Sequence, residues 1–128
     1  MADTDLRGWT ILVLEDEPLI GLDMAMSLED AGAEVRGPMR DTATALAAIA
    51  TEHASDDLHA AVLDVNLGDH TCEEVARRLD ALGIPYVLHT GDWTGNADLI
   101  ERLDVPVVRK PAQGATLVVA LRRHASGS

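Results

Sequence analysis

Short runs of apolar, mostly β-branched residues alternate along this 128-residue chain with longer segments in which apolar residues recur at helical spacing. Most of the short runs are nearly continuous, which is typical of strands that are buried on both faces of a parallel sheet. This pattern predicts five strands. They are residues 10–14, 33–37, 60–64, 85–89 and 105–108.

Five helices are predicted between and after these strands. The first is expected from Pro18 to Gly32, because proline suits a first helical turn and glycine suits a helix end. The third opens with Thr71 and Glu74 at the spacing of a capping box. The second follows Asp41, the fourth spans residues 95–103 and the fifth runs from residue 111 to 124. The expected apolar stripes are Ile20, Met24, Leu28 and Ala31, then Leu46, Ile49, Ala50 and His53, then Val75, Leu79 and Leu82.

The alternation of strands and helices predicts one doubly wound α/β domain, with a five-stranded parallel sheet and five helices. Right-handed crossovers then place helices on both faces of the sheet. Of the two common doubly wound strand orders, the five-stranded, flavodoxin-like order 2-1-3-4-5 fits the number of strands. No repeat or linker divides the chain, so we expect a single domain over residues 1–128 with its core at about residues 10–124.

Composition and charge narrow the class of protein. Hydrophobic residues make up 47% of the chain and charged residues 25%, which is ordinary for a globular domain. Ten basic residues against 22 acidic residues give a net charge of −12, which disfavours nucleic acids and anionic membranes as partners. The single cysteine, Cys72, excludes an internal disulfide, and we expect it to be unreactive. Without a signal peptide or a long apolar run, the protein is expected to be soluble and cytoplasmic.

Polar and charged residues stand where four of the five strands end. Glu15 and Asp16 follow the first strand, and Asp64 closes the third. Thr90 follows the fourth strand and Lys110 follows the fifth. The carboxyl ends of parallel strands meet at one edge of the sheet, where such folds bind their ligands. Each residue alone could be a helix cap, a turn residue or a solvated charge, but together they indicate a functional site.

These residue types suit phosphoryl chemistry. Clustered carboxylate oxygens are the hard ligands that Mg²⁺ prefers. Thr90 can donate a hydrogen bond to a phosphoryl oxygen, and Lys110 can neutralise another. Phosphoryl transfer needs mainly positioning and charge neutralisation, and a carboxylate can itself act as the nucleophile to form an acyl phosphate.

Four segments of the chain carry a family resemblance: ILVLEDEP, AAVLDVNLGD, VLHTGDW and VVRKP. As a set they resemble the signature segments of receiver domains of bacterial two-component response regulators, over about residues 10–124. The resemblance implies that Asp64 accepts a phosphoryl group from a phosphohistidine. It also implies that Asp16, Asp64 and the backbone carbonyl of Asn66 ligate Mg²⁺ directly, while Glu15 acts through water.

The same resemblance makes Thr90 the switch hydroxyl and Lys110 the family's lysine, joined to Pro111 by a cis peptide bond. Typical receivers carry an aromatic residue or histidine three residues before that lysine, where this chain has Val107. The segment after Thr90 partly resembles the FATGUY subfamily of single-domain receivers, with Trp93 in place of the tyrosine. That subfamily implies kinase partners of the HWE or related classes, and a loop switch in which Trp93 reports activation.

Three classes of function use residues of these types at a sheet edge. The leading one is a stand-alone receiver rather than an enzyme, although catalysis of its own dephosphorylation is compatible with it. Phosphorylation by a sensor histidine kinase or a phosphotransferase would control binding of a downstream target, or would drain phosphate from the kinase. The alternative is a small Mg²⁺-dependent phosphatase with an aspartate nucleophile, but Asn66 stands where a general acid is expected. A flavodoxin-type flavin or nucleotide binder is disfavoured because Glu15, Asp16 and Glu17 would repel a phosphate unless a metal intervened.

One histidine stands beside the expected switch hydroxyl. His89 directly precedes Thr90, in the fourth strand. The five histidines of the chain show no metal-ligand spacing. We therefore expect His89 to be a packing residue whose polar atoms are satisfied.

Overall fold

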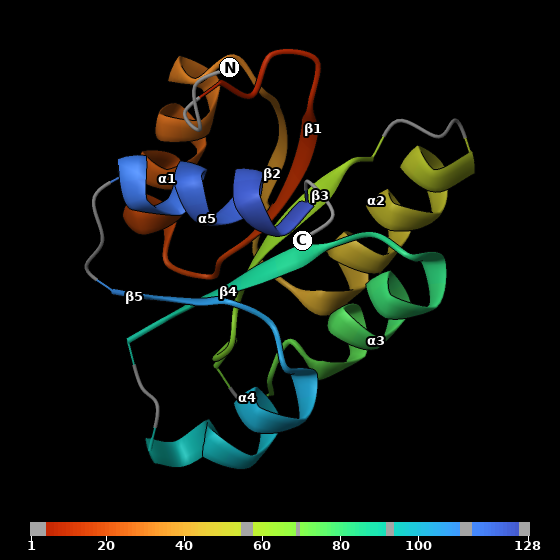
Figure 1. The fold of residues 1–128 in the computed structure, drawn as a ribbon. Coiled ribbons are helices and arrows are strands. Elements are labelled where there is room, and N and C mark those ends of the chain that lie inside the picture. The colour runs from red at the N-terminus through yellow and green to blue at the C-terminus, as the bar shows by residue number, and fades with distance from the viewer. Residues whose placement is uncertain (1–4, 55–57, 69, 92–93, 111–113, 126–128) are drawn as a thin grey trace.

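A computed structural model describes residues 5–54, 58–68, 70–91, 94–110 and 114–125. Its five parallel strands form one sheet in the order β2-β1-β3-β4-β5 (Figure 1), which confirms the predicted fold class and strand order. The strands are β1 (Thr10–Leu14), β2 (Glu34–Met39), β3 (Ala60–Asp64), β4 (Tyr86–Thr90) and β5 (Val107–Arg109). The helices are α1 (Pro18–Asp30), α2 (Thr42–Ala54), α3 (Glu73–Leu82), the short 3-10 helix η1 (Thr94–Asn96), α4 (Ala97–Leu103) and α5 (Gly114–Ala125).

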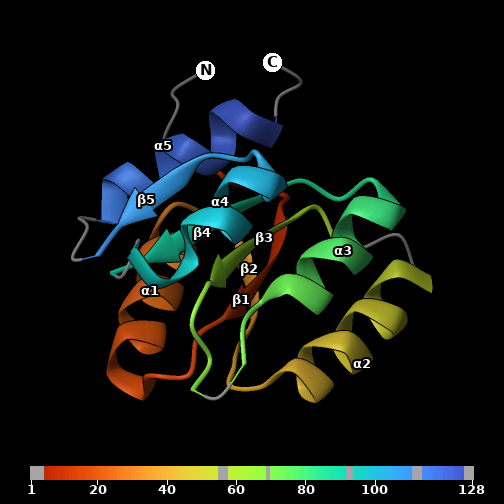
Figure 2. The same cartoon turned by 90° about the horizontal axis from the view of Figure 1, so that it is seen from below.

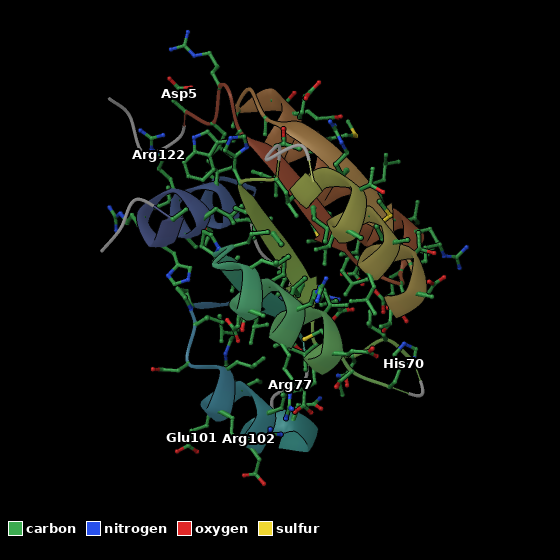
Figure 3. All side chains as sticks on the ribbon, turned by 90° about the vertical axis from the view of Figure 1, so that its right-hand side faces the viewer. Asp5, His70, Arg77, Glu101, Arg102 and Arg122 are labelled. Atoms are coloured by element: carbon green, nitrogen blue, oxygen red, sulfur yellow. The ribbon has the colours of Figure 1, made fainter. Side chains whose placement is uncertain are left out.

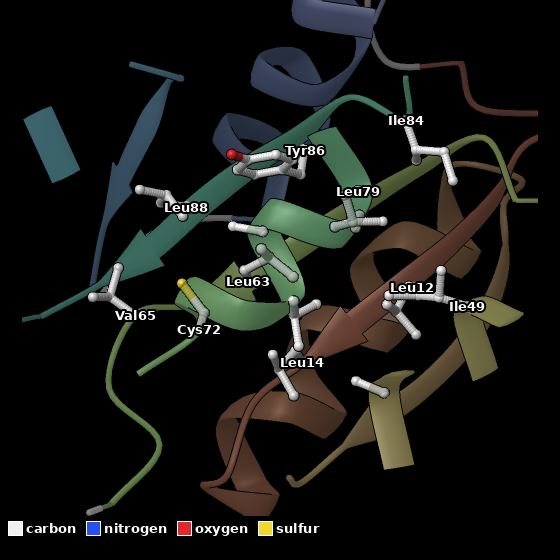
Figure 4. Close-up of a cluster of buried hydrophobic side chains, with 14 of the residues drawn as sticks. Leu12, Leu14, Ile49, Leu63, Val65, Cys72, Leu79, Ile84, Tyr86 and Leu88 are labelled. Atoms are coloured by element: carbon white, nitrogen blue, oxygen red, sulfur yellow. The ribbon is translucent and has the colours of Figure 1, made fainter. Parts of the chain in front are cut away.

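Two hydrophobic clusters cover the two faces of the sheet. Successive side chains of a strand point to opposite faces, so Leu12 and Leu63 enter one cluster while Ile11 and Val13 enter the other. Helices α2, α3 and α4 contribute side chains to the first cluster, and Figure 4 shows part of it around Leu12, Leu63 and Leu79. Helices α1 and α5 cover the second, on the opposite side of the sheet (Figure 2). Burial on both faces explains the continuous apolar runs of the central strands.

Prolines shift the starts of β4 and β5 later than the sequence pattern predicts. Pro85 and Pro106 stand before these strands, and a proline has no N–H for the hydrogen-bond ladder. Their carbonyls still accept hydrogen bonds, from Ala61 N–H at 3.1 Å and from Leu88 N–H at 3.0 Å. At its other end, β4 includes Thr90, which pairs with Arg109 of β5.

The capping box predicted at the start of α3 is wrong. Cys72 is the N-cap residue and has no side-chain cap bond. Its N–H donates to the carbonyl of Val65 at 3.1 Å, which holds the chain so that the helix begins at Glu73. The hydroxyl of Thr71 instead accepts a hydrogen bond from the N–H of Glu73 at 3.3 Å. The helix therefore starts one residue later than the capping box requires.

The helices are amphipathic, but one predicted stripe is misplaced. In α1, Met24 and Leu28 are buried as expected. In α2, Ile49 is buried together with Ala45, while Ala50 is exposed, so the buried face is rotated from the predicted one. No helix in the described part of the chain has the length and apolar character needed to cross a membrane.

Candidate functional site

Three carboxylates meet where β1 and β3 end side by side. Asp64 closes β3, and Glu15 and Asp16 directly follow β1, its neighbour in the sheet. One ligand oxygen from each of the three lies within 4.8 Å of the other two. Glu15 is fully buried and Asp64 is only 3% exposed, while Asp16 is half-buried. The pairing of β1 with β3 thus brings together the three predicted acidic residues.

Lys110 places an ammonium group against two of these carboxylates. Its backbone N–H donates to the carbonyl of Thr90 at 2.9 Å, which anchors the residue directly after β5. Its Nζ lies 2.8 Å from Oε1 of Glu15 and donates a hydrogen bond to Oδ2 of Asp64 at 3.2 Å. The lysine side chain is only 15% exposed, so little water screens these contacts.

Burial and like charge perturb the ionisation of this cluster. Burial first, and then hydrogen bonding and repulsion from Glu15, raise the pKa of Asp64 to about 8, although Lys110 opposes the shift. Burial alone would lower the pKa of Lys110, but Glu15 and Asp64 leave that pKa raised overall. The ammonium therefore stays charged at neutral pH, and it only partly offsets the crowding of the carboxylates.

The carboxylate oxygens of this cluster suit a hard divalent cation as ligands. With all three carboxylates ionised, as direct binding of an ion requires, the ammonium of Lys110 would leave two negative charges in the cluster. All three candidate side chains offer oxygen atoms, which Mg²⁺ and Ca²⁺ prefer. A divalent cation would favour the ionised form of Asp64, against the burial and the repulsion from Glu15 that raise its pKa.

The two remaining predicted residues lie at the same edge of the sheet. Thr90 is fully buried at the end of β4, and its neighbour His89 pairs with Asp64 in the parallel ladder between β3 and β4. Asn66 follows Asp64 by two residues, and its N–H donates to Oδ1 of that carboxylate at 3.3 Å. The side-chain oxygen of Asn66 accepts a hydrogen bond from Nδ2 of Asn96 at 2.8 Å. Sequence reasoning missed Asn96, because no motif marks a contact between residues 30 positions apart.

The expectation that His89 is a satisfied packing residue is wrong. The residue is 4% exposed, and its Nδ1 has no hydrogen-bond partner in the described part of the chain. That nitrogen lies 4.0 Å from Oε1 of Glu15. Burial first, and then the charge of Lys110, lower the pKa of His89 although Glu15 opposes the shift. A neutral imidazole therefore borders the acidic cluster. The sequence feature that could have placed His89 at this site is its position directly before Thr90.

Some predicted features lie outside the described residues. Neither Trp93 nor Pro111 is among them, so the loop switch and the cis Lys110–Pro111 bond stay predictions. Val107 is half-buried and pairs with Leu88 in the ladder between β4 and β5. The thiol of Cys72 is buried, and this burial above all raises its pKa to about 12. Such a thiol is unreactive at neutral pH, as expected.

No protein-family model and no curated protein sequence matches this chain. Solved structures do match, among them a response regulator receiver protein from Sinorhizobium medicae with a TM-score of 0.75 at 23% identity, covering 93% of this chain and 95% of that one. A response regulator from Burkholderia pseudomallei has a TM-score of 0.75 at 21% identity, covering 92% of this chain and 69% of that one. Its structure contains a phosphorylated aspartic acid, a calcium ion and citrate.

A third similar structure is the response regulator PhyR from Brucella abortus, with a TM-score of 0.75 at 22% identity. The match covers 97% of this chain but 50% of PhyR, so this chain spans half the length of that protein. Identities this low establish the fold alone. The chain therefore has the flavodoxin-like fold of response regulator receiver domains.

Proposed function

We propose that this chain is a receiver domain in which Mg²⁺-dependent phosphorylation of Asp64 controls binding of a partner protein or drains phosphate from a sensor histidine kinase. The observation that carries the proposal is the contact of Lys110 with both Glu15 and Asp64, beside Asp16. These are the groups that an acyl phosphate and its counter-ion require. The phosphorylated aspartate and calcium ion in the Burkholderia pseudomallei regulator support the same chemistry on this fold.

In the proposed reaction, a carboxylate oxygen of Asp64 attacks the phosphorus of a phosphohistidine. The P–O bond forms as the P–N bond breaks, and the departing histidine nitrogen takes up a proton from water. Lys110, whose Nζ lies 3.2 Å from Oδ2 of Asp64, can neutralise one phosphoryl oxygen. The hydroxyl of Thr90 would donate a hydrogen bond to another. Each step uses a group that the strand ends hold at one edge of the sheet.

The proposed metal ligands are Asp16, Asp64 and the backbone carbonyl of Asn66, with Glu15 acting through water. Bound Mg²⁺ would neutralise charge on the carboxylates and on the incoming phosphoryl group. The raised pKa of Asp64 gives a physical reason for metal dependence. Attack requires the ionised carboxylate, and added positive charge beside it favours that form.

An exposed apolar stripe on α1 supports the proposal that the phosphate donor is a protein. Leu19, Leu22 and Met26 are 81%, 53% and 54% exposed, and they are the large apolar side chains that stand exposed in the described part of the chain. Their spacing places them on one face of α1. The stripe begins three residues after Asp16 and borders the exposed acidic Asp23. A partner with an apolar surface and a basic rim would fit this stripe, so we propose that the kinase or phosphotransferase docks here.

The direct test is phosphorylation by a small-molecule donor. The chain is incubated with acetyl phosphate and Mg²⁺, and its intact mass is measured. We expect one added phosphoryl group in the wild type and none in Asp64→Ala or in wild type treated with a chelator. Leu22→Ser, a change on the exposed stripe, should leave this reaction unchanged because acetyl phosphate needs no docking surface. Equal labelling of wild type and Asp64→Ala would overturn the proposal.

The FATGUY-like switch and an HWE-class kinase belong to the same proposal. Val107 cannot act as a rotating aromatic on β5, which favours another reporter near Thr90. Fluorescence with Mg²⁺ and beryllofluoride, a mimic of the acyl phosphate, tests this point. Trp9→Phe should keep the spectral change and Trp93→Phe should lose it. A signal that follows Trp9 instead would remove the loop switch from the proposal.

A further inference from the structure

A side-chain hydrogen bond joins the loop after β3 to the segment that precedes α4. Nδ2 of Asn96, the last residue of η1, donates to Oδ1 of Asn66 at 2.8 Å. Asn66 follows Asp64 by two residues, and its own N–H donates to Oδ1 of that carboxylate. Asn96 is therefore connected to the phosphoacceptor position through one intervening residue.

A second polar contact attaches the other end of the same segment. Arg102 of α4 donates from its guanidinium to Oε2 of Glu73 at 3.0 Å, and Arg77 donates to the same oxygen at 2.7 Å. Figure 3 shows Arg77 and Arg102 converging between α3 and α4. Between the two polar contacts, Leu99 and Ile100 bury their side chains in the cluster under α3. The segment from η1 through α4 is thus attached to Asn66 and Glu73, which both lie after the strand that carries Asp64.

From these contacts, and resting on the function proposed above, we propose that Asn96 is a positioning residue for the divalent-ion site. Its amide fixes the side chain of Asn66, and a fixed side chain restricts the orientation of the adjoining backbone carbonyl, the proposed ligand. Asn96 does not touch the ion itself. Its contribution is to reduce the conformational freedom that Asn66 loses when the ion binds.

The coupling is reciprocal by thermodynamic necessity. If the Asn96 contact strengthens ion binding, then ion binding strengthens the attachment of η1 and α4 by the same factor. The ion site and the surface of α4 are then linked through the loop after β3. This link is separate from Thr90 and needs no aromatic side chain on β5, where this chain has Val107.

A double-mutant cycle tests the inference, with the Mg²⁺ dissociation constant measured by amide NMR titration. Asn96→Ala and Asn66→Ala each remove the hydrogen bond from one side, and Asn66→Ala keeps the backbone carbonyl. A side-chain hydrogen bond of ordinary strength corresponds to an increase of about two- to tenfold in the dissociation constant. The double variant should be no weaker than either single variant, because both remove the same contact. Unchanged affinity in Asn96→Ala, or additive losses in the double variant, would overturn the inference.

Glu101→Ala is the matched control, since Glu101 is exposed on α4 and points away from the site (Figure 3). It should bind Mg²⁺ as the wild type does. Hydrogen exchange supplies a second readout: saturating Mg²⁺ should slow exchange of amides 94–103 in the wild type and in Glu101→Ala, but less in Asn96→Ala. If Mg²⁺ does not bind the wild type at all, the proposed function fails. If it binds and protects all three proteins equally, only the role of Asn96 fails.

Discussion

Leu63 and Asp64 are neighbours in β3 and are buried almost equally, at 0% and 3% exposure. Leu63 points into the cluster beneath α2 and α3, where its burial removes apolar surface from water. Asp64 lies at the end of the same strand, where burial beside Glu15 raises its pKa to about 8. The same degree of burial therefore stabilises the fold at one residue and costs stability at the next.

The contrast between Leu63 and Asp64 separates the apolar interior, which stabilises the fold, from the charged edge of the sheet, where we place the function. The apolar interior needs no added group to be stable, because side chains from both sheet and helices fill it. At the carboxyl edge, Glu15, Asp16 and Asp64 lie together, and the ammonium group of Lys110 contacts Glu15 and Asp64. Crowded like charges that persist despite their cost are typical of sites selected for a ligand. The proposed ion and phosphoryl group are the ligands that would relieve this crowding.

The largest expected change in stability comes from a substitution in the apolar interior, at Leu63. Leu63→Ala should lower the free energy of unfolding by about 2–5 kcal/mol, because it leaves a cavity in a filled core. Urea unfolding followed by circular dichroism measures this loss. Leu19→Ala, at an 81% exposed position, is the control and should change stability by no more than about 0.5 kcal/mol. Similar losses in both variants would show that the cluster does not stabilise the fold as described.

The next expected change is in the melting temperature, when Mg²⁺ binds at Glu15, Asp16 and Asp64. Mg²⁺ should raise the melting temperature of the wild type, because an ion that binds only the folded state stabilises it, by about 2.7 kcal/mol at a hundredfold excess over Kd. Open sites bind Mg²⁺ weakly, so the gain should be smaller. Asp16→Ala should lose the response and should melt higher than the wild type in chelator, since one of three crowded carboxylates is gone. An equal Mg²⁺ response in both proteins would exclude Asp16 as a ligand.

The charged edge should also give a pH dependence through Asp64, whose pKa rises from 3.8 to about 8 on folding. Between these values the folded protein holds more protons than the unfolded chain, so the free energy of unfolding falls as pH rises. One proton accounts for at most about 1.4 kcal/mol per pH unit. Urea unfolding in chelator, from about pH 5 to about pH 8, should show this fall in the wild type relative to Asp64→Asn. Parallel curves for the two proteins would mean that Asp64 titrates normally.

The central strands and the acidic cluster could be predicted from the sequence for the same reason. Strands buried on both faces leave continuous apolar runs, so the residue at which each run ends is visible. Asp64 ends one run and Glu15 follows another, and parallel pairing of β1 with β3 brings them together. The effect of Pro85 and Pro106 on strand starts follows from chemistry, but the apolar pattern alone does not show it.

Other features depend on tertiary contacts that no local pattern records. The start of α3 was misplaced because the N–H of Cys72 bonds to Val65, seven residues earlier. The contact of Asn96 with Asn66 joins η1 to the loop after β3, and the two sequences carry no shared signal. The placement of His89 Nδ1 at 4.0 Å from Oε1 of Glu15 depends on the order of the strands, which no local pattern shows.

The central claim is that the buried carboxylate of Asp64, and no other group at this edge, accepts the phosphoryl group. Borohydride reduction tests it directly, because it converts an aspartyl phosphate into homoserine and leaves free carboxylates unchanged. The chain is treated with acetyl phosphate and Mg²⁺, reduced, digested and mapped by peptide mass spectrometry. We expect homoserine at position 64 alone, and none when Mg²⁺ is withheld. Homoserine at position 16, or no conversion at position 64 in folded protein with Mg²⁺ present, would contradict the account.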